Sequence, residues 1–142
     1  MADTLQFELV SPEKLVLSQL VEMVVVPGAE GDFGAMPMHA PLISAVRPGV
    51  IEVYQGGKVS SRIFIAGGFA EVTAERCTVL AEEAWPLAEL DAAKVAARLE
   101  AAEKAQVSAD NDFAKGQAQL ALAVAEAMRQ AIGAKAEGTA AH

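Results

Sequence analysis

A turn-rich segment of about fifteen residues constrains this chain more than any other part of its sequence. It reads Pro27-Gly-Ala-Glu-Gly-Asp-Phe-Gly-Ala-Met-Pro-Met-His-Ala-Pro41. Its three prolines restrict φ and donate no backbone hydrogen bond, and its three glycines reach backbone angles forbidden to other residues. We expect such a constrained loop to present its polar side chains, Glu30, Asp32 and His39, at fixed positions.

The composition of the chain changes near residue 86. All six prolines lie at or before Pro86, and no glycine occurs between Gly68 and Gly116. The first part is rich in Val, Ile and Phe, which favour strands, whereas the second is rich in Ala, Glu, Lys and Leu, which favour helices. The sequence therefore predicts an α+β chain: a β-sandwich over residues 1–86, followed by an antiparallel two-helix hairpin over residues 87–142.

Short alternating segments fill the first part. Leu5 to Leu9 alternates apolar and polar residues, which predicts a half-buried strand. The apolar face of a further strand, ending at Pro27, is predicted to consist of Val21, Met23 and Val25. Later strands are expected at 42–46, 50–55, 58–66, 69–73 and 77–82. Many short strands at close spacing indicate a β-sandwich or a flattened barrel.

Two helices are expected in the second part, from Leu90 to Gln106 and from about Asp112 to Ile132. Apolar residues recur on each at helical spacing. The two stripes are Leu90, Val95, Leu99 and Ala102, and Phe113, Leu120, Val124 and Met128. The polar break between the helices contains the cap candidates Ser108, Asp110 and Asn111. Residues from 133 onward are expected to form a frayed tail.

Charge and composition exclude several classes of protein. The chain of 142 residues has a formal net charge of −8, so we expect no binding to nucleic acid. Cys77 is the only cysteine, which excludes an internal disulfide and a cysteine-based zinc site, and we expect it to be a small buried hydrophobe. No stretch reaches the roughly 18–20 apolar residues of a membrane span, and the first residues are not a signal peptide. A cytosolic chain without membrane insertion is expected.

Several motifs of the chain, taken in order, resemble the epsilon subunit of bacterial F-type ATP synthases. The opening segment is similar to that family's signature P-G-x-E-G-x-x-G-x-x-P-G-H-A-P-L, and Met38 stands where the family usually has glycine. Further similar blocks are Pro48-Gly-Val50, Gly67-Gly-Phe-Ala-Glu-Val72 and Val79-Leu-Ala-Glu82. The resemblance covers residues 5–95 by motif, and the shared order and spacing of the blocks carry it.

The resemblance implies a non-catalytic subunit in the central stalk, or rotor, of a proton-translocating ATP synthase. Such subunits bind the gamma subunit, rest on the ring of c subunits and couple ring rotation to the catalytic head. In many members the helical hairpin extends toward the alpha and beta subunits and restrains ATP hydrolysis. The implied location is the cytoplasmic face of the bacterial inner membrane, as a peripheral part of the complex and without a cofactor.

For the opening segment, the resemblance implies contacts with two partners. It places His39 at the gamma subunit and the acid Asp32 against the polar loop of the ring, with Glu30 and Met38 as neighbouring contact residues. The alternatives stay open: His39 satisfies backbone groups of the loop, the acids are solvated, and Met38 packs within the loop. Catalysis by His39 would need a nucleophile and an orienting acid at suitable spacing, and an EF-hand would need a distal Glu. We therefore expect no catalytic and no metal-binding residue.

The start of the first helix is similar to a nucleotide motif. Some epsilon subunits bind ATP through [IL]-D-x-x-R-A, to which Leu90 and Asp91 correspond, whereas Lys94 replaces the arginine. A lysine does not reproduce the planar fork of an arginine, so this motif is degenerate. The alternative is that Asp91 lies at the helix start, where the helix dipole favours a negative charge.

Basic residues of the second helix are the candidates for contact with the catalytic head. They are Lys115, Arg129 and Lys135, and Glu126 and Glu137 partly cancel their charge. We therefore expect weak docking and mild inhibition at most.

Two other functions fit parts of this sequence. A stand-alone nucleotide-sensing regulatory module would use the hairpin as a lid, and a hydrolase would use His39. A stable complex with gamma would favour the stalk subunit, and tight nucleotide binding by the isolated chain would favour the sensor.

Overall fold

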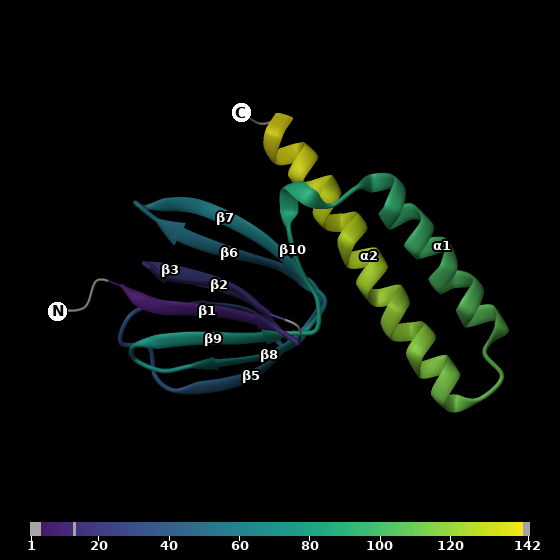
Figure 1. Cartoon of the computed structure of the whole chain (residues 1–142), viewed down its shortest axis with the longest axis horizontal. Coiled ribbons are helices and arrows are strands. Elements are labelled where there is room, and N and C mark those ends of the chain that lie inside the picture. The colour runs from purple at the N-terminus through teal and green to yellow at the C-terminus, as the bar shows by residue number, and fades with distance from the viewer. Residues whose placement is uncertain (1–3, 13, 141–142) are drawn as a thin grey trace. The chain divides into compact units, whose positions relative to one another are not determined.

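The computed structural model describes residues 4–12 and 14–140, with side chains for residues 4–12 and 15–134. The chain separates into two compact units, Met1–Pro86 and Leu87–His142. Figure 1 shows strands in the first unit and helices in the second. The predicted α+β class, a β-sandwich followed by two helices, is confirmed.

Ten strands make up the first unit within the described residues. They are β1 (Leu5–Ser11), β2 (Lys14–Val21), β3 (Met23–Gly28), β4 (Gly31–Ala35), β5 (Leu42–Val46), β6 (Gly49–Gln55), β7 (Lys58–Ile65), β8 (Gly68–Val72), β9 (Arg76–Ala81) and β10 (Ala84–Pro86). Their order is β10-β7-β6-β3-β5-β8-β9-β1-β2, with β4 paired to β3. The sheet folds over, so that β6 and β7 lie in one layer and β5, β8 and β9 in the other (Figure 1).

The core lies between these two layers. In β1 the predicted alternation is confirmed, because Leu5, Phe7 and Leu9 are buried while the residues between them are half-buried. Val24 and Ile51 of the other layer are completely buried in the same cluster. Strands with one apolar and one polar side therefore determine which side of each layer faces inward.

The apolar face predicted for the strand before Pro27 is wrong beyond its first residue. That predicted face is Val21, Met23 and Val25. In β3 the buried valines are instead Val24 and Val26, and the predicted Met23 and Val25 are half-buried. The chain bends at Glu22, between β2 and β3, so the alternation of side chains changes phase there.

The expected fifteen-residue loop is only partly irregular. β3 and β4 form a hairpin in which Gly28 pairs with Gly31 across a two-residue turn, Ala29-Glu30. Apart from that turn, residues 36–41 are the only part of the segment outside strands. The glycines of this segment indicated a loop, but two of them, Gly31 and Gly34, belong to the short strand β4, whose Ala35 packs into the core.

The second unit contains a 3₁₀ turn, η1 (Leu87–Glu89), and the helices α1 (Ala92–Ser108) and α2 (Asp112–Ala140). Asn111 caps α2, since its Oδ1 accepts from the Ala114 N–H at 2.8 Å. The prediction that the second helix ends at Ile132 is wrong: α2 continues to Ala140, because the residues after Gly133 include the strong helix formers Ala, Lys and Glu. The part of the expected tail at residues 141–142 lies outside the described residues.

The two helices pack through small side chains. On α1 the predicted stripe is confirmed, with Val95 and Ala102 buried. On α2 the predicted face is wrong at Phe113 and Leu120, whose side chains are 77% and 65% exposed. Among the residues of α2 up to position 134, the buried ones are Ala118, Ala125, Met128 and Ala131. Alanines at the contact allow the helix axes to approach closely, which turns the larger side chains outward.

Two backbone positions in the first unit have unusual angles. Gly68 begins β8 at a φ of 146°, and a Cβ there would lie 1.9 Å from the Leu80 carbonyl oxygen. Met38 has a φ of 68°, and it is the only non-glycine residue with a positive φ in the described part of the chain. This conformation costs a non-glycine residue roughly 1–2 kcal/mol.

We expect Gly68→Ala to lower the free energy of unfolding by about 3 kcal/mol, because the Leu80 carbonyl cannot retreat without breaking the β8–β9 pairing. Urea titration followed by circular dichroism measures the loss. Gly57→Ala is the matched control: its φ is 77°, but a Cβ there meets nothing within 4 Å, so a loss of only about 1 kcal/mol is expected. Equal losses in the two variants would contradict the steric argument.

Met38→Gly should instead raise the free energy of unfolding by about 0.5–1 kcal/mol, because glycine adopts a positive φ without strain. The same urea titration measures the gain. Met36→Gly is the control, since Met36 is also exposed but has no positive φ. It should lose a few tenths of a kcal/mol, on the order of the entropy that glycine adds to the unfolded chain. A loss in both variants would show that Met38 is not strained.

Candidate functional site

The outer side of the layer formed by β5, β8, β9, β1 and β2 carries a row of apolar side chains. By strand register the row runs Ala45, Phe69, Leu80, Val10 and Leu15, each paired with the next. Residues paired in this way lie side by side on one face of a sheet. Phe69 and Leu80 are 60% and 54% exposed, so the apolar row faces solvent.

A shallow depression of about 270 Å³ lies along the apolar row. Its lining includes Val10, Pro12, Phe69 and Leu80, with Ser11 and Glu82 as polar members. Contiguous exposed apolar surface is typical of sites where another protein binds. The depression is too open and too poor in polar groups to suit catalysis on a small molecule.

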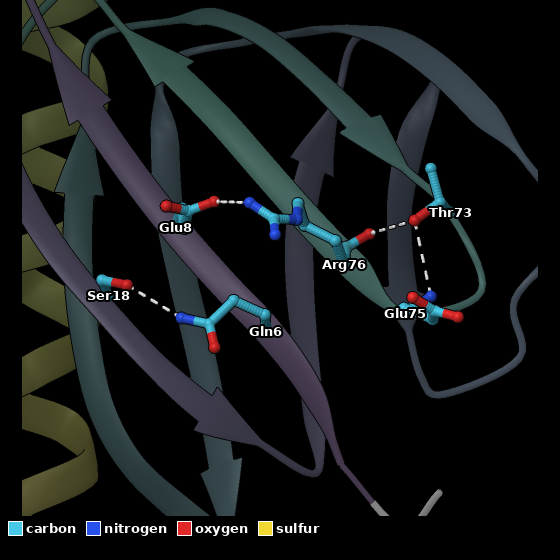
Figure 2. A network of polar contacts seen from close by, with 6 residues as sticks. All are labelled: Gln6, Glu8, Ser18, Thr73, Glu75 and Arg76. Carbon is cyan, nitrogen blue, oxygen red and sulfur yellow. Dashed lines mark hydrogen bonds and ion pairs between the residues drawn. The ribbon is translucent and has the colours of Figure 1, made fainter.

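The same side of the layer is polar beyond the apolar row, as Figure 2 shows. Glu8 forms an ion pair with Arg76 of the neighbouring strand β9. Gln6 donates from Nε2 to the Ser18 hydroxyl at 2.8 Å. These partners satisfy one another within the face, so the surface changes from apolar to polar within a few residues along each strand.

The loop of residues 36–41 is attached to the turn between β8 and β9. The Met38 N–H donates to the Ala74 carbonyl at 2.7 Å. Thr73 stabilises this β8–β9 turn. Its hydroxyl donates to the Arg76 carbonyl and accepts from the Glu75 N–H, both at 3.4 Å (Figure 2). The loop therefore lies at the end of the strands that carry the apolar row.

His39 lies in this loop and is half-buried. Its Nδ1 is 2.6 Å from the Ala40 carbonyl oxygen, and because a carbonyl only accepts, Nδ1 carries the proton. Its backbone N–H donates to the Met36 carbonyl at 3.1 Å. Met38, beside it, is 72% exposed and, with Ile43 of β5, adds apolar surface.

The acids Glu30 and Asp32 lie in the β3–β4 hairpin and differ in their surroundings. Asp32 is paired with Arg47, whose Nη2 is 2.5 Å from the Asp32 Oδ1. Glu30 is exposed in the two-residue turn, and its side chain forms no ion pair with the residues that the structure describes. Arg47 was not among the residues singled out from the sequence, because it reaches Asp32 only through the pairing of Gly28 with Val46.

The nucleotide-like motif forms a helix cap. The Oδ1 of Asp91 accepts from the backbone N–H groups of Ala93 and Lys94, at 2.8 and 3.4 Å, and so begins α1. The Lys94 side chain is exposed and Leu90 is buried. Lys115 and Arg129 are exposed on α2, and the side chain of Lys135 lies outside the described residues. The residues singled out from the sequence therefore belong to both units, the acids and His39 to the first and the nucleotide-like motif and the basic residues to the second.

Other chemistry receives little support in the part of the chain that the structure describes. Cys77 is buried, and desolvation raises its pKa to about 12, which keeps it a thiol. No group of three His, Cys, Asp or Glu residues there could hold a metal ion. Neither described helix combines the length and the apolar character needed to cross a bilayer.

Comparison with known proteins agrees with the fold. The sequence model described as ATP synthase, Delta/Epsilon chain, beta-sandwich domain matches residues 4–87. An ATP synthase epsilon chain of Rhodospirillum rubrum is 62% identical over 128 residues, which are 90% of this chain and 96% of that one. The epsilon chain of Paramagnetospirillum magneticum is 59% identical over 132 residues, covering 93% and 99% of the two chains.

Solved structures show the same likeness. A chain in the mitochondrial ATP synthase of Euglena gracilis, from a structure of OSCP, F1 and c-ring, has a TM-score of 0.79 at 29% identity, covering 93% of this chain and 83% of that chain. A chain in the central stalk and c-ring structure from Tetrahymena thermophila has a TM-score of 0.69 at 16% identity, covering 90% and 96%, and shares the fold. On the matched domain and the identity along nearly its whole length, this chain belongs to the family of ATP synthase epsilon chains.

Proposed function

We propose that this chain is a non-catalytic subunit of the central stalk in a proton-translocating F-type ATP synthase. It binds the gamma subunit and the c-ring, and it transmits ring rotation to the catalytic head. The observation that carries the proposal is the apolar row, which is exposed on the outer side of the sheet. The domain that contains this sheet matches the family of ATP synthase epsilon chains. The Euglena relative, resolved together with F1 and a c-ring, supports these partners.

The apolar row and the neighbouring loop are the proposed gamma contact. Burying one Phe or Leu side chain fully contributes about 1.5–3 kcal/mol. Phe69, Leu80 and Leu15 together could therefore supply several kcal/mol, on the order of what a specific complex needs after its entropic cost. His39 and Met38 lie beside this surface and would contact the edge of the same partner.

A rotor subunit has to resist deformation while it carries load. The two layers of the sandwich share a close-packed core in which Phe7, Val24 and Ile51 have no exposed surface. Such cores have low compressibility and transmit force. The acidic β3–β4 hairpin is the proposed ring contact, and it is joined to the same core through Val24 and Val26. The proposed location is the cytoplasmic face of the bacterial inner membrane, as a peripheral part of the complex.

The two-helix unit is the proposed regulatory part. Its contact is built largely from alanines, which bury little area, so the hairpin is held together weakly. Lys115 and Arg129 on α2 are the proposed contacts with the catalytic head. They are fourteen positions apart and Glu126 lies between them, so their attraction to an acidic surface is small.

Phe69→Ser should weaken binding of the full chain to purified gamma subunit at least tenfold, because a central apolar side chain is lost from the interface. Isothermal titration calorimetry measures the change. Phe113→Ser is the matched control, since Phe113 is also exposed but lies on α2, and it should change the affinity less than about threefold. Equal effects of the two substitutions, or unchanged binding by Phe69→Ser, would contradict the assignment of the apolar row to gamma.

Removing residues 88–142 from the assembled enzyme should raise its rate of ATP hydrolysis less than about tenfold. This limit corresponds to a free-energy preference for the inhibited state of under roughly 1.4 kcal/mol. The reason is the sparse positive charge and small apolar area of α2. Steady-state hydrolysis by enzyme with the full-length or the shortened subunit gives the ratio. Subunit content has to be equal in both preparations, and activation by a hundredfold would show that the hairpin docks strongly, through contacts other than Lys115 and Arg129.

A further inference from the structure

The connection between β4 and β5 begins with a tight turn, Met36-Pro37-Met38-His39. The His39 N–H donates to the Met36 carbonyl at 3.1 Å, and this bond closes a four-residue β-turn. A type II turn has a positive φ at its third position and often proline at its second, and Met38 has a φ of 68° after Pro37. Such a turn favours glycine at the position that Met38 occupies.

The Met38 side chain contributes little to folding in exchange for this unfavourable backbone conformation. It is 72% exposed, so it does not pack into a core. The backbone N–H of Met38 donates to the Ala74 carbonyl at 2.7 Å, a bond that glycine would form equally well. Strained positions without a benefit to the folded chain are concentrated at functional sites. The strain at Met38 therefore indicates that its thioether acts outside the folding of the chain.

The turn presents two thioethers to solvent. Met36 and Met38 are 52% and 72% exposed. The other methionines with described side chains are covered, since Met128 is 2% exposed and Met23 is half-buried. The Met23 sulfur lies against the backbone of Gly34, where a Cβ would be only 3.2 Å away from it. A dissolved oxidant therefore reaches the two turn methionines more easily than the other two.

Apolar surface continues from this turn onto β5. Ile43 is 74% exposed and lies two residues before Ala45, so its side chain is on the same outer side as the apolar row. Methionine is flexible and polarizable, and it adapts to the irregular apolar surface of a partner. A sulfoxide is polar, and it disrupts contacts that depend on methionine. Oxidation at this turn would therefore act on the edge of the proposed gamma contact.

We propose that Met36 and Met38 form a reversible oxidation site, at which hydrogen peroxide converts the thioethers of the unassembled subunit to sulfoxides and weakens its binding to gamma. This inference rests on the proposed gamma contact. In each reaction a sulfur lone pair attacks one peroxide oxygen, the O–O bond breaks, and the other oxygen leaves as water with both protons. The sulfur loses two electrons and the peroxide gains them. Methionine sulfoxide reductases reverse the change.

The site is tested by mass spectrometry of the full chain after treatment with dilute hydrogen peroxide. Peptide mapping should show that Met36 and Met38 acquire oxygen at least about threefold faster than Met23 and Met128, because they are more exposed. Saturating gamma should slow the oxidation of Met38 about threefold or more, because the contact covers its side chain. Equal rates for the exposed and the covered methionines, or an unchanged rate for Met38 in the complex, would overturn the proposal.

The effect on binding is tested by isothermal titration calorimetry with gamma, after the peroxide has been removed. The oxidised chain should bind about fivefold or more weakly than the untreated chain, and methionine sulfoxide reductases for both sulfoxide epimers should restore the affinity. In Met36→Leu combined with Met38→Leu, peroxide should change the variant's own untreated affinity less than about twofold. The matched control is Met128→Leu, which replaces a buried methionine by a side chain of similar volume and should remain as sensitive as the wild type.

Unchanged affinity of a chain oxidised at Met36 and Met38, or an equal loss in the double-leucine variant, would contradict the proposal. Failure of the untreated wild-type chain to bind gamma would overturn the proposed gamma contact and, with it, the effect of oxidation on binding. The order in which the methionines of the free chain are oxidised would still decide whether the turn is the oxidation site.

Discussion

The register of the layer formed by β5, β8, β9, β1 and β2 is the constraint on which the rest of this structure depends. Phe7, Cys77 and Val79 are completely buried on its inner side, so a shift of one residue in any of these strands would expose the core. With the inner side determined, Phe69 and Leu80 have to face outward. The apolar row is therefore a consequence of core packing and register together.

The polar pairs of the first unit shape the surface around that layer. The pair of Glu8 and Arg76 connects β1 to β9 on the outer side, and Arg62 is 3.1 Å from Glu52 across the β6–β7 pairing. Exposed pairs of this kind contribute about 0–1 kcal/mol each, so they adjust the surface more than they stabilise the fold. The same holds for the exposed pair of Arg47 and Asp32, which connects the end of β5 to the β3–β4 hairpin.

The two units differ in how they are stabilised, and this difference bears on their proposed roles. The sandwich buries Phe, Leu, Ile and Val between two hydrogen-bonded layers, as a load-bearing part of a stalk requires. The hairpin buries mainly alanine on α2 and leaves Phe113 and Leu120 in solvent. A weakly packed pair of helices can change partners at little energetic cost, which suits a regulatory element better than a rotor element.

The sequence by itself determined the features that arise from local periodicity and composition. The alternation in Leu5 to Leu9, the helical spacing of Val95 and Ala102 and the loss of proline after Pro86 predicted a β-sandwich followed by two helices, and the structure has that arrangement. The motifs in order also indicated the family. These signals are readable because neighbouring residues along the chain produce them.

The tertiary structure alone decided what depends on residues distant in the sequence. The apolar row takes one residue from each of five strands, and the pair of Arg47 and Asp32 joins residues fifteen positions apart. The phase change at Glu22 and the alanine face of α2 likewise follow from which element packs opposite. Local periodicity indicates that a strand or helix has an apolar side. The strand or helix that packs against it determines its register and which of its sides is buried.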